Sequence, residues 1–351
     1  MILFKSVTLY SPLNKGEYDV LVGGKTVLAI ERRLDIPQHY PVKVIEGRGL
    51  KLCPAFIDGH VHIAGAGGEG GPASRTTEIQ LSHMFEGGVG TVVGCLGTDG
   101  MTRHPESVLM KVKALRQEGV SAWMYTGAYQ VPPPTFFGDV GKDIALIDEV
   151  IGLPRNSVCL TTRLESSWLA LSWLNRVSHA RVGGMLGGKA GIVNIHMGDA
   201  ENPFRPLHEI VENSEIQYKQ FLPTHCNRNP HIFKDALEYG KKGYIDLTSS
   251  SYPYFPDIEV KPSEAIARIL QSEVPLSHLT MTSDGLGSLP HFDDQGNLVK
   301  LENGDIHHLY LKSSKTLLQR KSGAFPGCFA RCNLQSCRYS EAERQRLCSS
   351  R

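Results

Sequence analysis

The chain has 351 residues, which suggests about two domains or one large domain with an appendage. With 41% hydrophobic and 21% charged residues it is not disordered throughout, and its 36 Gly and 20 Pro lack the period of collagen. No apolar run is long enough to cross a bilayer, and a net charge of +1 gives no global attraction to nucleic acid or an acidic membrane, so we expect neither partner.

Residues 1–52 are rich in β-forming residues, with Gly and Pro between the apolar runs. Strands are predicted at 2–10, 18–24, 26–33 and 42–52. They indicate a small sheet domain or part of a β-sandwich. Residues 1–12 lack the pattern of a signal peptide, and the cysteines of the body are spread singly, which is typical of a reducing cytoplasm.

From residue 54, short apolar strands alternate with amphipathic helices. Eight strands are predicted, at 54–62, 91–99, 121–129, 157–163, 192–199, 221–227, 244–250 and 279–285. Helices are predicted between several of them, at 105–118, 142–151, 230–241 and 263–272. This alternation predicts an α/β fold, a (β/α)₈ TIM-like barrel. An open doubly wound sheet is the alternative, but no glycine-rich phosphate loop follows the first strand.

Polar residues collect at the carboxyl ends of four predicted strands, which meet at one mouth of such a barrel. They are His60, His62, His196, His225 and Asp284. In an H-x-H pair on a strand both imidazoles point to the same face. A single histidine is more often a core or surface residue, but the five together favour a metal site. Their nitrogen and oxygen donors suit zinc, with manganese, iron or cobalt as alternatives.

Longer motifs surround these residues in a fixed order. They are Pro54-Ala-Phe-Ile-Asp-Gly-His60-Val-His62, Gly67-Gly-Glu69-Gly-Gly-Pro72, Gly97-Thr98-Asp99, Arg103-His-Pro-Glu-Ser107, Thr126-Gly-Ala-Tyr129, Arg181-Val-Gly-Gly184, Gly187-Gly-Lys189, His196-Met-Gly-Asp199, Leu222-Pro-Thr-His225-Cys-Asn-Arg228-Asn and Ser283-Asp284-Gly-Leu-Gly-Ser288. Together they resemble the isoaspartyl (β-aspartyl) dipeptidases of the amidohydrolase superfamily. The resemblance covers roughly residues 1–152 and 181–310.

The resemblance implies metal-dependent hydrolysis of β-aspartyl dipeptides by a metal-bound hydroxide, with one or two Zn²⁺ ions. It assigns the first ion to His60, His62 and Asp284, the second to His196 and His225, and the general base to Asp284. It implies that Tyr129 polarises the scissile carbonyl and that Glu69, assisted by Thr98, binds the α-amino group of the substrate. It implies further substrate contacts for Arg228, Ser288 and Arg163. Read alone, Tyr129 could be a core residue, Thr98 a turn residue and Glu69 a solvated loop residue.

Strand four departs from the family pattern. The resemblance implies a carboxylated lysine on this strand that bridges both ions. Depending on the alignment, Pro154 or Asn156 occupies that position, and residues 153–180 contain no lysine. A catalytically impaired homologue that binds only metal or peptide is therefore one alternative. Another amidohydrolase activity, such as cyclic-amide hydrolysis, is the second.

The last segment, 311–351, also departs from the family pattern, because it contains nine Lys and Arg residues and only two Glu. Its Cys328, Cys332 and Cys337 have only weak zinc-knuckle spacing. We therefore divide the chain into a β domain at 1–52, a barrel at 53–310 and an atypical basic, Cys-rich tail at 311–351. The resemblance also implies a homo-oligomer.

Overall fold

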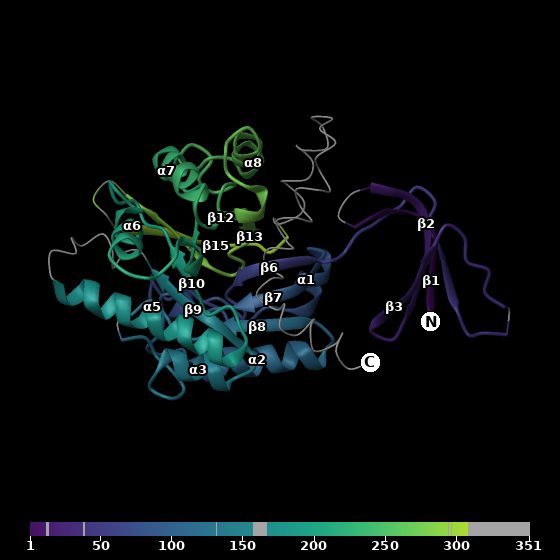
Figure 1. Ribbon diagram of the computed structural model, residues 1–351, viewed down its shortest axis with the longest axis horizontal. Coiled ribbons are helices and arrows are strands. Elements are labelled where there is room, and N and C mark those ends of the chain that lie inside the picture. The colour runs from purple at the N-terminus through teal and green to yellow at the C-terminus, as the bar shows by residue number, and fades with distance from the viewer. Residues whose placement is uncertain are drawn as a thin grey trace. The chain divides into compact units, whose positions relative to one another are not determined.

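A computed structural model describes residues 1–11, 14–37, 39–130, 132–156, 167–293, 295 and 297–307. These residues fall into two compact units, Met1–Ala55 and 56–307 (Figure 1). The tail 311–351 and the residues 157–166, which include Arg163, lie outside the described residues.

The first unit is one five-stranded sheet. Its strands are β1 (Ile2–Tyr10), β2 (Asn14–Gly23), β3 (Thr26–Glu31), β4 (Lys43–Glu46) and β5 (Lys51–Leu52). They follow the order β3-β2-β1-β4, with β5 also beside β1. Val7, Leu9 and Val20 are buried on one face of the sheet. The strands predicted at 2–10, 18–24 and 26–33 are thus confirmed, whereas the one predicted at 42–52 is two short strands, β4 and β5. The described part of this unit contains no second sheet, so the sandwich stays a prediction.

The second unit contains eight strands in the order of a barrel. They are β6 (Phe56–Val61), β7 (Val89–Gly94), β8 (Ser121–Tyr125), β9 (Val150–Asn156), β10 (Ile192–His196), β11 (Phe221–Thr224), β12 (Ile245–Thr248) and β13 (Leu279–Thr282). The first six form one parallel sheet in chain order, and β12 and β13 form a parallel pair.

Backbone hydrogen bonds connect this pair to both edges of the six-stranded sheet. Cys226 N donates to Asp246 O at 3.0 Å beside β11 and β12, and His62 N donates to Gly285 O at 2.9 Å beside β6 and β13. The fold of this unit is therefore α/β and TIM-like, as the strand–helix alternation predicts.

Helices cover the outside of these strands. They are α1 (Leu81–Glu86), α2 (Pro105–Gln117), α3 (Val140–Leu146), α5 (Ser167–Gly187), α6 (Arg205–Glu212), α7 (Pro230–Gly240) and α8 (Pro262–Leu270). Short 3₁₀ turns at Pro72–Ser74, Tyr218–Gln220 and Leu276–His278 and a hairpin of β14 (Ser288–Phe292) and β15 (Leu298–Asn303) complete the described elements. In Figure 1, α2, α3 and α5 lie along β8–β10, and α7 and α8 lie beside β12.

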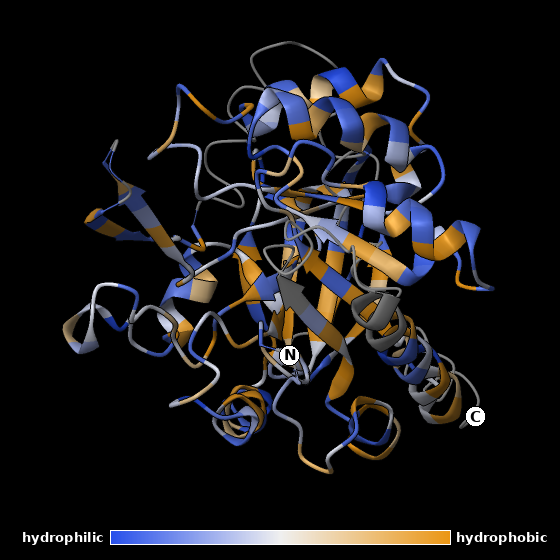
Figure 2. Ribbon diagram, turned by 90° about the vertical axis from the view of Figure 1, so that its left-hand side faces the viewer, coloured by the Kyte–Doolittle hydropathy of each residue, from blue (hydrophilic) through white to orange (hydrophobic). Residues whose placement is uncertain are grey.

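Helices α2, α7 and α8 are amphipathic, as their periodicity predicts. In α2, Val108, Val112 and Leu115 are buried on the face expected for the core. Figure 2 shows helices with both hydrophilic and hydrophobic stretches around strands that are largely hydrophobic. Within the described residues, no helix combines the length and apolar character needed to cross a membrane.

The prediction for strand four and the helix before it is wrong in position. Helix α3 ends at Leu146 instead of continuing to residue 151, and β9 begins at Val150, seven residues before the expected strand. Val150, Ile151 and Leu153 are all buried, because the strand is enclosed on both faces. A short continuous apolar run of this kind cannot be distinguished from the end of a helix by periodicity.

A buried carboxylate connects three strands of the barrel. Asp246 on β12 is fully buried and accepts hydrogen bonds from Thr224 on β11 at 2.6 Å and from Thr280 and Thr282 on β13 at 2.6 and 2.7 Å. Burial raises the pKa of Asp246, and the three hydroxyl donors oppose that shift. The interaction holds β11–β13 in register near the end of the barrel where His225 and Asp284 lie.

We expect Asp246→Ala to lower the free energy of unfolding by about 3 kcal/mol, because it leaves buried hydroxyls without their acceptor. Urea denaturation with a chelator present measures the change without a contribution from bound metal. Asp257→Ala, at an exposed carboxylate, is the control. If Asp246→Ala and Asp257→Ala unfold at the same urea concentration, the carboxylate does not hold these strands together.

Candidate metal centre

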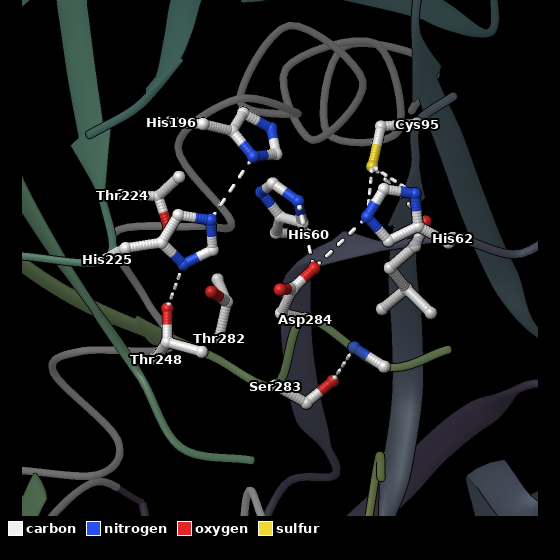
Figure 3. Close-up of polar contacts among 12 residues, drawn as sticks. His60, His62, Cys95, His196, Thr224, His225, Thr248, Thr282, Ser283 and Asp284 are labelled. Carbon is white, nitrogen blue, oxygen red and sulfur yellow. Dashed lines mark hydrogen bonds and ion pairs between the residues drawn. The ribbon is translucent and has the colours of Figure 1, made fainter. Parts of the chain in front are cut away.

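Four histidines and one aspartate converge at the carboxyl ends of the barrel strands (Figure 3). His60 and His62 lie at the end of β6, His196 ends β10, and His225 and Asp284 follow β11 and β13. Asp284 Oδ1 lies 3.1 Å from His62 Nε2 and 3.4 Å from His60 Nε2. His225 Nε2 lies 3.1 Å from His196 Nδ1. The structure thus brings together all five residues that the sequence singled out as metal ligands.

The ring of His60 lies at the middle of this group. Its centroid is 4.3 Å from that of His196, 5.5 Å from that of His62 and 5.7 Å from that of His225. Among the described residues, neither ring nitrogen of His60 has a hydrogen-bond partner, nor has Nε2 of His196. Both side chains are buried, and burying an unpaired polar atom costs free energy. These unpaired nitrogens fit a divalent cation.

Two sets of donor atoms are close enough to hold a metal ion. One set is His60, His196 and His225, and the other is His60, His62 and Cys95. Within each set, one donor atom from each residue lies within 4.8 Å of the others. Because His60 belongs to both sets, the two sets are adjacent.

Surrounding residues fix the orientation of the ligands. Asp58 on β6 is fully buried, accepts from the backbone N of Ser283 at 3.1 Å and of His60 at 3.3 Å, and also binds the Ser283 hydroxyl. The Thr248 hydroxyl lies 2.6 Å from His225 Nδ1. These contacts join the end of β6 to that of β13 and the end of β11 to that of β12. The positions of the predicted ligands therefore depend on the closure of the barrel.

Two of the predicted ligands have strained backbones. His225 has φ 61° and Asp284 has φ 56°, in the left-handed region that residues other than glycine rarely adopt. Such strain costs on the order of 1–3 kcal/mol per residue and concentrates at functional sites. Gly287 leaves room for the resulting turn, because a Cβ there would lie 2.5 Å from Asp284 Oδ1.

Burial and neighbouring charges perturb the titration of these groups. Burial opposes ionisation of Asp284, but the hydrogen bond with His62 and the nearby imidazoles hold its pKa well below the usual range. Burial lowers the pKa of His225 to about 3. Burial also raises the pKa of Tyr129, whose hydroxyl lies 2.8 Å from His196 Nδ1. Against the effect of burial, the neighbouring Cys95 and Asp284 raise the pKa of His60 to about 9 and that of His62 as well. The centre therefore combines an anionic carboxylate, two imidazoles of raised pKa, two of lowered pKa and a protonated phenol.

A cavity of about 880 Å³ opens onto this centre. Besides His62, His196, His225 and Asp284, its wall includes the predicted substrate residues Glu69, Thr98, Tyr129, Arg228 and Ser288. Ser288 Oγ donates to Glu69 at 2.7 Å, and Arg228 Nε lies 3.2 Å from both carboxylate oxygens of Asp199. Arg163 lies outside the described residues, so its predicted substrate contact stays a prediction.

The sequence analysis missed two residues in this region. Cys95 follows β7 directly, but the predicted strand extended to residue 99 and concealed this position at a strand end. Glu259 lines the cavity, where it accepts a hydrogen bond from Ser251 at 2.8 Å. Glu259 lies in a loop before α8 that carries no motif, so no sequence signal identified it.

The comparisons with known proteins agree with this geometry. A solved β-aspartyl dipeptidase from the thermophilic, keratin-degrading Fervidobacterium islandicum AW-1, in complex with β-Asp-Leu, is 36% identical to the chain. The match covers 96% of this chain and 86% of that protein, with a TM-score of 0.86. A second β-aspartyl dipeptidase structure from that organism gives 33% identity and a TM-score of 0.82, and the match covers the same shares of the two chains.

The chain belongs to the β-aspartyl dipeptidase family. These are hydrolases, and the more distant matches share the fold. A crystal structure of a dihydroorotase is 14% identical, with a TM-score of 0.61 over 97% of this chain and 84% of that one. A curated dihydroorotase from Aquifex aeolicus is 36% identical over 53 residues, which is 15% of this chain and only 12% of that protein. No family model matches the chain.

The partly buried Glu259 gives a test of cavity electrostatics. Burial raises its pKa to about 7, while Ser251 and Arg228 oppose the shift. The neutral form is favoured in the folded state, so folding loses stability as pH rises from about 4.5 to 7. Glu259→Gln, which cannot ionise, should match the parent at pH 4.5 and exceed its free energy of unfolding by about 1–3 kcal/mol at pH 8.5.

Urea denaturation at the two pH values measures this difference. Glu118→Gln, at an exposed glutamate after α2, is the matched control and should show no pH-dependent gain. A constant difference between Glu259→Gln and the parent at both pH values would contradict the raised pKa.

Proposed function

We propose that this member of the family hydrolyses β-aspartyl dipeptides with the help of one or two divalent metal ions, zinc first among them. The observation that carries the proposal is a cavity lined by His62, His196, His225 and Asp284, together with charged and polar side chains, where Nε2 of His196 has no hydrogen-bond partner among the described residues. The similarity to a protein described in complex with β-Asp-Leu supports the substrate class.

The residues present fit a metal, because both ring nitrogens of His60 and Nε2 of His196 are buried without hydrogen-bond partners among the described residues. His60, His62 and Asp284 would hold one ion, and His196 and His225 the other. When bound, a divalent ion acts as a Lewis acid on water and on the scissile carbonyl.

The polypeptide's own groups would position the dipeptide and move protons. Asp284 is ionised and lies at the base of the cavity, so it can accept a proton from the attacking water and pass it to the leaving amine. Tyr129 stays protonated and can donate a hydrogen bond to the carbonyl oxygen as negative charge develops there. Addition of water and cleavage of the side-chain amide then give aspartate and the second amino acid.

Three wall residues would bind the charged ends of the substrate. Arg228 uses its Nε on Asp199, which leaves the two terminal nitrogens of the guanidinium for a substrate carboxylate. Glu69 would bind the α-amino group, assisted by Thr98. Ser288, which donates to Glu69 here, would turn its hydroxyl to a carboxylate.

A specific observation also favours the impaired homologue. In the parallel pairing of β9 with β10, Pro154 lies opposite Asn194 and Asn156 lies opposite His196, so neither position that the sequence offers for the family lysine carries one. This second candidate binds metal and dipeptide but has little or no turnover.

One experiment separates these candidates. The full chain is loaded with zinc and incubated with β-Asp-Leu, α-Asp-Leu or dihydroorotate, and the products are quantified by chromatography. Release of aspartate and leucine from the β-linked dipeptide alone supports the proposed function. Dipeptide binding without release supports the impaired homologue, and dihydroorotate opening supports a cyclic-amide hydrolase.

The broader organisation is proposed on the sequence evidence. We keep a β domain at 1–52 as part of a sandwich, a barrel at 53–310 and a separate tail at 311–351. Self-association into a homo-oligomer and a cytoplasmic location complete the proposal. Light scattering of the full chain measures the mass of the particle in solution. The mass of a single chain would contradict the homo-oligomer.

Arg228→Lys should raise KM and lower kcat/KM for β-Asp-Leu by roughly 10- to 100-fold, because a point charge replaces a bidentate fork. Steady-state kinetics of the zinc-loaded protein measures the effect. Arg205→Lys is the control, since Arg205 is an exposed residue of α6 paired with Glu209. Unchanged kinetics of Arg228→Lys in an active preparation would remove Arg228 from the substrate site.

A further inference from the structure

Cys95 is a buried thiol beside the predicted metal ligands, and the proposed function gives it no role. It directly follows β7, just as His62 directly follows β6. Its side chain is fully buried, with Sγ 3.7 Å from His62 Nδ1 and 4.0 Å from His62 Nε2. Figure 3 shows the sulfur beside the His62 ring, near both of its nitrogens, and Asp284 beside one of them.

The spacing of the donor atoms suits a small divalent ion. In a tetrahedral zinc site the Zn–S and Zn–N bonds, about 2.3 and 2.0–2.1 Å, place sulfur and nitrogen roughly 3.5 Å apart. One donor atom each from His60, His62 and Cys95 lie within 4.8 Å of one another, so small side-chain rotations suffice.

An independent observation points to a ligand at the same place. His60 is fully buried, and neither of its ring nitrogens has a hydrogen-bond partner in the described part of the chain. A buried imidazole normally has at least one partner. A metal ion between His60, His62 and Cys95 would satisfy it.

Charge favours the thiol as well. Asp284 is the sole anion among the five residues predicted as ligands, and two divalent ions held by one carboxylate and four neutral imidazoles would repel each other strongly. A Cys95 thiolate adds a second negative donor. Thiolate is also a preferred ligand of zinc and of related borderline-soft ions.

We propose that Cys95 is a metal ligand that binds one divalent ion as a thiolate together with His60 and His62. Binding releases the thiol proton to solvent and changes no oxidation state. The inference rests on the metal site of the proposed function, but not on its substrate. The ion so held is zinc in the proposal, and cobalt is its spectroscopic substitute.

Cys95 also belongs to a buried apolar cluster that includes Val93, Tyr125 and Leu222. Replacing it can therefore loosen the barrel for reasons unrelated to metal. A matched control is Cys226, a second fully buried thiol, whose Sγ contacts Pro223 O at 3.2 Å. Cys226 belongs to neither candidate set of metal ligands.

The test is cobalt titration of the metal-free full chain without substrate, followed by absorption. The wild type should develop a near-ultraviolet thiolate-to-cobalt charge-transfer band. Cys95→Ser should lose that band and bind cobalt about tenfold more weakly or worse, while Cys226→Ser keeps both. Cys95→Asp, which retains an anionic oxygen donor, should bind cobalt without the band.

An identical band in the wild type and Cys95→Ser would overturn the proposal, as would a wild type that binds cobalt without a band or binds none. If Cys95→Ser does not fold, a full chain is used in which the six cysteines other than Cys95 and Cys226 are serine. Bound cobalt with the band supports the proposal there, and bound cobalt without it overturns the proposal.

Hydrolysis of β-Asp-Leu is measured separately, so the two proposals fail in different ways. A band without hydrolysis keeps Cys95 as a ligand and overturns the proposed function. Hydrolysis without a thiolate band supports the proposed function and overturns the role of Cys95 as a ligand.

Discussion

The constraint on which the rest of the structure depends is the burial of four imidazoles and a carboxylate within a few ångströms of one another. Buried polar atoms need partners, which the centre can find in the protein or in a bound ion. Asp284 Oδ1 contacts His62 and lies 3.4 Å from His60 Nε2, but neither ring nitrogen of His60 has a hydrogen-bond partner among the described residues. Such an arrangement costs stability, and binding of the proposed cation would recover that free energy.

The surrounding barrel has to supply the stability that the centre lacks. Asp246 receives three threonine hydroxyls from β11 and β13, and Asp58 links β6 to the residue before Asp284. Both carboxylates are fully buried, and burial raises the pKa of Asp58 to about 7, so each depends on its hydrogen bonds. This rigid frame can hold His225 and Asp284 at positive φ. The hydrogen bonds of Asp58 and Asp246 thus stabilise the barrel around these two strained residues.

The sequence predicted what depends on pattern and missed what depends on packing. Repeated strand–helix alternation predicted the TIM-like fold, and the position of His60, His62, His196, His225 and Asp284 at strand ends predicted which residues meet. The start of β9 could not be read, because a strand buried on both faces has no alternation. Cys95 was missed because the predicted strand extended past it, and Glu259 was missed because its loop carries no motif. The backbone strain at Asp284 could not be predicted, because the neighbouring glycines are its only sign in the sequence.

The unpaired atoms also make the centre electrically asymmetric. Asn194 Oδ1 and His196 Nε2 on β10 have no hydrogen-bond partner within the described residues, and β10 pairs with β9, where Pro154 offers no backbone N–H. On the opposite side, Asp284 and Cys95 both contact His62. The acidic side chains therefore lie beside His60 and His62, whose pKa values they raise, whereas burial lowers the pKa values of His196 and His225. In the metal site that we propose, a first ion would be held most strongly beside Asp284, and a second ion beside His196 and His225 would have to overcome repulsion from the first with little negative charge nearby.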